Sequence, residues 1–97
     1  MSIDAELNQL LIVPSHPQQI LTMVASALLS EDPLAPLDLD TLNAYLLDAF
    51  LAVTVDVPAV VAAEVSVTAA RALPSIHDGE TPDAYALRLR DVARGLR

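Results

Sequence analysis

A histidine beside acidic residues is the arrangement in this sequence that comes closest to a chemical site. The run His77-Asp78-Gly79-Glu80 places an imidazole among carboxylates, and these groups can bind a divalent metal or transfer a proton. Neighbours on a short loop cannot all converge on one ion, and the other histidine, His16, is remote in the sequence. Ser75 adds a hydroxyl, but a catalytic triad gathers its members from separate elements around an oxyanion hole. We therefore expect a solvated turn here.

Two aspartates near Asn43 form a second candidate, which faintly matches a calcium loop. Asp38 and Asp40 are spaced like its first two ligands, but the pattern needs an oxygen ligand at the fifth position and glycine at the sixth. Leu42 and Asn43 occupy these positions, so helix capping explains both aspartates better. The chain has no cysteine and only two glycines. The sequence therefore predicts no catalytic, cofactor-binding or metal-binding residues, and a protein that is not an enzyme.

The charge of the chain is unevenly distributed along its length. The 97 residues have a net charge of −8, and no basic residue precedes Arg71. An anionic body repels a phosphate backbone, and an aromatic content of 3% leaves few rings for stacking on bases. Direct nucleic-acid binding is therefore not expected, and the bulk of the negative charge is explained most simply as an aid to solubility.

No segment of the sequence is typical of a membrane span or a secretory signal. The first residues include acids where a signal peptide needs basic residues. The two most apolar stretches, 7–30 and 44–63, are interrupted by prolines, amides or aspartates, and acids at bilayer depth are costly. We expect a cytoplasmic protein without membrane contact, organised as a single helical domain over residues 1–97.

Prolines and capping residues divide the chain into helices. Pro17, Pro58 and Pro82 each fall where a first helical turn tolerates the missing N–H, and Thr81 can cap the last helix. The expected helices run from 2 to about 13, from 15 or 16 to about 29, from 38 or 40 to about 55, from 56 to about 73, and from 81 to the C-terminus. The sequence therefore predicts an all-α fold, a compact bundle of four to five short helices in which the third and fourth form a central hairpin.

One segment also fits a different secondary structure. Residues 53–57 alternate apolar and polar side chains, residues 65–68 do the same, and β-branched residues favour strands. The alternative fold is therefore α+β, with a short hairpin near 53–68. No tight-turn signal lies between the two stretches and the alanine content is high, so helices are favoured.

The expected helix over 38–55 is apolar on two sides. Its primary stripe consists of Leu42, Tyr45, Leu46, Ala49 and Val53. A second stripe on roughly the opposite side consists of Ala44, Leu47, Leu51 and Val55. This pattern fits either a central helix enclosed on both sides or a helix whose second stripe is a protein interface. The next helix has a ridge of small residues that predicts close packing: Ala59, Ala62, Ala63, Ser66 and Ala70.

The basic residues of the last helix are the candidate for polar recognition. Arg90, Arg94 and Arg97 are expected on one side of this helix with Arg88 nearby, and together they could bind an acidic partner. A solvated helix face whose cations suit the C-terminal dipole explains the same residues.

The sequence contains apolar helix surface in excess but no chemical apparatus. It therefore predicts a non-enzymatic protein–protein interaction module, such as a small adaptor, regulator or accessory subunit, that forms a homodimer or higher homo-oligomer through aliphatic helix faces. Two alternatives stay open. One is an acidic inhibitor or decoy that occupies a basic groove of a partner, which requires the carboxylates to cluster on one face. The other is a small structural subunit of a larger assembly such as a phage-like particle.

Overall fold

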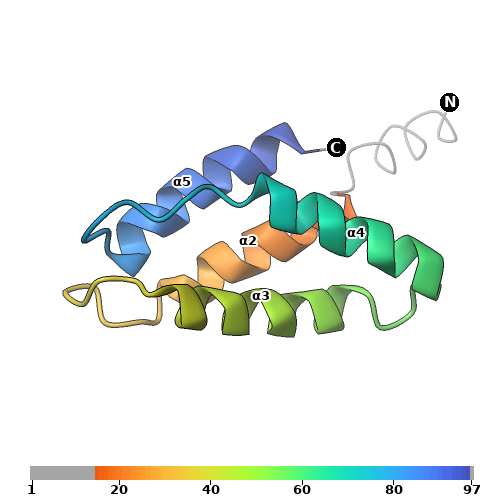
Figure 1. The fold of residues 1–97 in the computed structure, drawn as a ribbon, viewed down its shortest axis with the longest axis horizontal. Helices are drawn as coiled ribbons and strands as arrows, with labels where there is room; N and C mark the ends of the chain where they lie inside the picture. The colour runs from red at the N-terminus through yellow and green to blue at the C-terminus, as the bar shows by residue number, and fades with distance from the viewer. Residues whose placement is uncertain (1–14, 97) are drawn as a thin grey trace, which may run out of the picture.

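The computed structural model describes residues 15–96, and these residues form an all-α fold (Figure 1). The helices are α2 (His16–Leu28), α3 (Leu39–Val53), α4 (Ala59–Ala72) and α5 (Pro82–Gly95). The predicted all-α bundle is confirmed. No strand occurs within 15–96, so the alternative hairpin near 53–68 is not formed; most of that segment lies in α4. The helix expected over 2–13 lies outside the described residues.

Three of the four helices have as their N-cap one of the start positions that the sequence allows: Ser15, Asp38 and Thr81. Ser15 accepts a hydrogen bond from the Gln18 N–H, and Thr81 caps α5 in the same way. The Asp38 carboxylate accepts the Thr41 N–H at 2.7 Å. This bond from the Thr41 backbone lowers the pKa of Asp38, because it stabilises the charged form. Capping therefore fixes where α2, α3 and α5 start.

Helix α2 forms the centre of the molecule. Its five core residues have no exposed surface: Ile20, Leu21, Val24, Ala25 and Leu28. Helix α2 packs against α5, α3 and, over a shorter contact, α4. The expected central hairpin of α3 and α4 is therefore corrected: the two helices follow each other through the turn at 54–58, but each packs on α2. The reason is that α3 and α4 bury only two residues each, too few to form a centre.

The other helices contribute narrower faces to the same core. Helix α5 buries Tyr85, Ala86, Leu89 and Ala93, together with Pro82 at its start. Helix α3 buries Leu42 and Ala49 of the predicted primary stripe, while Tyr45, Leu46 and Val53 are partly buried against the core. Within residues 15–96, every residue of this core is aliphatic or aromatic. The predicted inner face of α3 is thus correct.

Helix α4 has the weakest attachment to the core of the four. Its N-cap is Pro58, which offers no side-chain hydrogen bond, so the start expected at residue 56 lies two residues too early. Only Val65 and Ala69 are buried, and most of the small-residue ridge expected to pack closely is exposed. Valine at four of its fourteen positions also lowers its intrinsic helix propensity.

Within residues 15–96, no helix has the length and apolarity needed to cross a bilayer.

Candidate protein interface

The side of α3 that faces away from the core is aliphatic. Leu47 and Leu51 are 56% and 58% exposed, and Val55, just beyond the helix, is 76% exposed. Ala44 is exposed on the same side of the helix. All four residues of the second stripe are therefore open to solvent, and α3 is not the doubly enclosed helix that the sequence also allowed.

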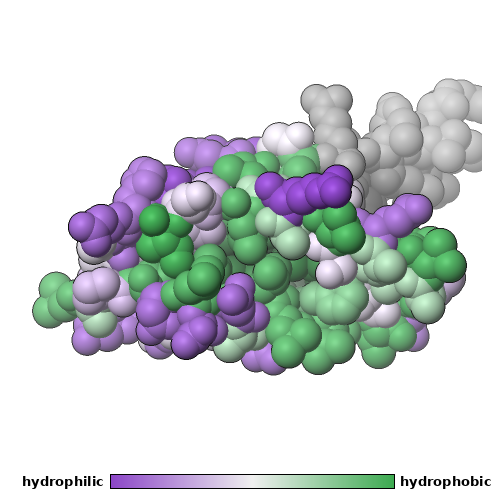
Figure 2. All heavy atoms as spheres, viewed as in Figure 1, coloured by the Kyte–Doolittle hydropathy of each residue, from purple (hydrophilic) through white to green (hydrophobic). Residues whose placement is uncertain are grey.

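Helix α4 also has exposed aliphatic side chains on the side away from its buried residues. Val60 and Val67 lie two turns apart on its outer side, and Val60 is 75% exposed. Of the eleven large hydrophobic side chains exposed within 15–96, six lie between residues 47 and 67. Figure 2 shows hydrophobic residues gathered over the end of α3, the turn and the start of α4. We call this area the aliphatic surface; it consists of Ala44, Leu47, Leu51, Val55, Val60 and Val67.

Carboxylates lie among and beside these side chains. Asp48 is one helical turn from both Ala44 and Leu51, and Glu64 is one turn from both valines of α4. The ion pairs found within 15–96 are Arg88 with Glu80 and Arg94 with Asp91, both made by arginines of α5. Among the described residues, four acids of α3, the turn and α4 make no ion pair: Asp40, Asp48, Asp56 and Glu64. The surface is therefore apolar with an anionic rim.

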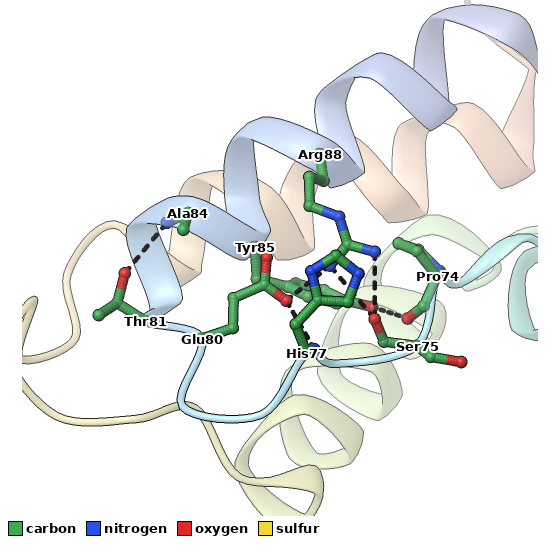
Figure 3. Close-up of polar contacts among 8 residues, drawn as sticks. All are labelled: Pro74, Ser75, His77, Glu80, Thr81, Ala84, Tyr85 and Arg88. Carbon is green, nitrogen blue, oxygen red and sulfur yellow. Dashed lines mark hydrogen bonds and ion pairs between the residues drawn. The ribbon is translucent and has the colours of Figure 1, made fainter.

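The arginines predicted for recognition do not form one patch. Arg88 turns toward the loop before α5, where its Nη1 atom lies 2.6 Å from Oε1 of Glu80 (Figure 3). Both terminal nitrogens also donate to the Ser75 carbonyl oxygen, at 3.2 and 3.1 Å. Arg88 precedes Arg90 by two positions, which places the two about 200° apart around the helix. Arg88 therefore cannot lie on the same face as Arg90. The prediction that Arg88 lies near the other arginines is therefore wrong.

The remaining arginines are described in part. Arg94 is exposed and lies 3.2 Å from the exposed carboxylate of Asp91, and Arg90 is partly exposed. Arg97 lies outside the described residues. A screened surface pair of this kind contributes little to stability and leaves the cation accessible. Of the four arginines predicted for recognition, the structure therefore places Arg90 and Arg94 together on one side of α5.

A polar network fixes the loop between α4 and α5. The buried Tyr85 donates its hydroxyl hydrogen bond to the Pro74 carbonyl oxygen at 2.8 Å, and Arg88 lies over the Tyr85 ring at 5.7 Å (Figure 3). The Glu80 carboxylate accepts the His77 backbone N–H at 3.0 Å in addition to Arg88. We call this network the polar clasp; it consists of Pro74, Ser75, His77, Glu80, Tyr85 and Arg88.

Burial and pairing shift the pKa values of two groups in the polar clasp. Burial raises the pKa of Tyr85 to about 12, with Arg88 opposing the rise and Glu80 adding to it. Burial also acts to raise the pKa of Glu80, but the hydrogen bonds from His77 and Arg88 outweigh it and the pKa is lowered. The clasp therefore holds a charged carboxylate, a charged guanidinium and a neutral phenol at neutral pH.

The polar clasp holds the loop before α5 in place through its own hydrogen bonds. Its polar groups bond to one another, and Gly79, with φ of 74°, allows the tight turn that returns Glu80 to His77. The His77 residue itself is exposed. No group of three histidine or acidic residues able to hold a metal occurs within 15–96. Sequence reasoning missed the clasp, although Tyr85 and Arg88, one turn apart on α5, were a usable signal.

The fold and the surface together define a small all-α chain with an exposed aliphatic surface and an anionic rim. Comparisons of the chain with protein-family models, with curated proteins and with solved structures found no match.

Proposed function

We propose that this chain is a non-enzymatic protein-interaction module that binds other chains, including copies of itself, through the aliphatic surface. The observation that carries the proposal is the exposure of Leu47 and Leu51 on the side of α3 opposite its buried residues. Removing apolar surface from water is favourable by about 25 cal/mol per Å². Leucines one turn apart on an outer helix face gain this free energy only when a partner covers them. Contiguous exposed apolar areas of this kind mark protein interfaces.

The weak attachment of α4 supports the same proposal. This helix has no side-chain cap, no acid in its first turn and only two buried residues. Short helices gain most of their stability from tertiary packing. A partner that covers Val60 and Val67 would bury a second side of α4, so binding and ordering of this helix would be coupled.

The proposal includes the role and the location expected from the sequence. An adaptor, regulator or accessory subunit needs a contact surface and no catalytic apparatus, and the aliphatic surface supplies such a contact. Self-association is part of the proposal, because two copies can cover each other's leucines. We place the protein in the cytoplasm.

Absolute molar mass in solution, measured by size exclusion with light scattering over a range of protein concentrations, tests the proposal. We expect the wild-type chain to exceed the monomer mass of 10.3 kDa, and Leu47→Asp and Leu51→Asp to be monomeric. The matched control is Leu87→Asp, which introduces the same change at a leucine of similar exposure on α5 and should leave the mass unchanged. Circular dichroism of each variant verifies the fold. An unchanged oligomer in both α3 variants would remove the aliphatic surface from the proposal, and a monomeric wild type would remove self-association.

A further inference from the structure

The rim of the aliphatic surface restricts what can cover it. Asp48 interrupts the exposed stripe of α3 between Ala44 and Leu51, and Asp56 follows Val55 directly. Glu64 occupies the same position between Val60 and Val67 on α4. These carboxylates are exposed, and no cation of this chain pairs with them within 15–96. Any partner that covers the aliphatic side chains therefore brings its own charges close to these acids.

A second copy of the chain is a poor electrostatic match for this surface. A symmetric contact sets the same surface of both chains face to face, so the acids of one copy approach the acids of the other. Like charges in an interface cost free energy, and salt relieves that cost by screening. Self-association through this surface should therefore be weak, and it should strengthen as salt is added.

We infer that the physiological occupant of the aliphatic surface is a cationic amphipathic helix of a partner protein. The inference rests on the proposed function and names the partner's chemistry. The apolar stripe of such a helix would cover Leu47, Leu51 and the valines, which is the usual way that an amphipathic helix is recognised. Its flanking lysines or arginines would pair with the carboxylates of the rim: Asp40, Asp48, Asp56 and Glu64.

The dimensions of α3 suit this partner. The stripe from Ala44 to Leu51 spans about 10 Å of helix, and Val55 follows it in the turn just beyond the helix. A partner helix of about 18 residues, about 27 Å long, covers the stripe with room for cations at both ends. The long aliphatic stems of lysine and arginine add apolar contact while their charged ends reach the rim.

The experiment uses a designed, dye-labelled helical peptide of about 18 residues with leucines every third or fourth position and arginines on both flanks. A matched peptide has glutamate in place of each arginine. Fluorescence anisotropy with the full chain measures binding of both. We expect the arginine peptide to bind at least tenfold more tightly than the glutamate peptide, and its affinity to fall as sodium chloride is raised. Self-association, measured by light scattering, should instead strengthen as sodium chloride is raised.

Substitutions in the chain localise the contact. We expect Asp48→Arg to weaken binding of the arginine peptide about fivefold, because one attraction becomes one repulsion at an exposed site. The matched control Asp78→Arg makes the same change in net charge on an exposed loop residue and should alter binding less than twofold. Leu47→Asp should abolish binding while Leu87→Asp should not.

The outcomes separate this inference from the proposed function. Equal binding of the two peptides, or equal effects of Asp48→Arg and Asp78→Arg, would overturn the cationic partner. If Leu47→Asp still abolishes self-association in that case, the interaction surface stands and a second copy is its occupant. If neither peptide binds and Leu47→Asp leaves self-association unchanged, both the inference and the proposed function fail.

Discussion

The two halves of this molecule satisfy their side chains in different ways. In the half formed by α2 and α5, ten residues of the two helices are buried, and the adjoining polar clasp pairs its polar groups within the chain. In the half formed by α3 and α4, each helix buries two residues and exposes leucine or valine on its outer side. The acids of this second half are also without cations within 15–96. The buried residues and the polar clasp of the first half, which we call the complete half, are satisfied by contacts within the chain, including those of α2 with α3 and α4. The outer side of the second half has no such contacts within 15–96.

Under the proposed function, this difference separates the residues that stabilise the fold from the residues that bind a partner. A side chain whose contacts are all internal affects the free energy of unfolding when it is changed. A side chain that is exposed in the folded chain has little to lose on unfolding, so its removal should affect association instead. Substitutions in the two halves should therefore have effects of different kinds, and matched changes in each half test that separation.

The largest expected effect comes from the core of the complete half. Leu89 of α5 has no exposed surface, and Leu89→Ala should lower the free energy of unfolding by about 2–5 kcal/mol through lost burial and a residual cavity. Leu47→Ala, the same change on the outer side of α3, should alter it by less than about 0.5 kcal/mol. Urea unfolding followed by circular dichroism, with the chain dilute enough to be monomeric, measures both. Similar losses at the two leucines would contradict the separation of the two halves.

The polar clasp should give the next largest effect. The Glu80 side chain is only 5% exposed, so Arg88→Ala leaves its carboxylate without a cation and should cost about 1–3 kcal/mol of unfolding free energy. The control Arg94→Ala removes the exposed pair with Asp91 and should cost less than about 1 kcal/mol. Urea unfolding of both variants gives the comparison. Equal costs would show that Arg88 has no more structural importance than a surface arginine.

The sequence predicted the local features of this fold well. Ser15, Asp38 and Thr81 were identifiable as caps because capping depends on residues within one turn. The inner and outer stripes of α3 were also correct, since periodicity alone divides a helix into faces. The stripe Ala44, Leu47, Leu51 and Val55 was therefore identifiable from helical spacing alone, although its role as an interface is still a prediction.

The features that depend on tertiary arrangement were not predictable in this way. The apolar character of α3 and α4 suggested a central hairpin. The position of a helix depends on which other helices pack against it, and α2 is central because α3, α4 and α5 all pack on it. Arg88 was assigned to a recognition patch because helical spacing does not reveal that a preceding loop folds back to supply Glu80 and Ser75. The spacing of Tyr85 and Arg88 is local, but the bonds that close the clasp join residues eight to thirteen positions apart, which no local pattern contains.

The smallest expected effect is a pH dependence of stability that arises in the polar clasp. The pKa of Glu80 is lowered in the folded chain, so the folded state favours the charged carboxylate. Its contribution is fully present above the ordinary glutamate pKa of 4.5 and is lost as the pH falls through the lower folded value. The difference in unfolding free energy between wild type and Glu80→Gln should therefore be constant near neutral pH and shrink below about pH 4.5. The same comparison in an Arg88→Ala background should show less change with pH, because a partner that stabilises the charged form is then missing. A difference that stays constant to pH 2.5 in both backgrounds would show that pairing in the polar clasp does not stabilise the complete half.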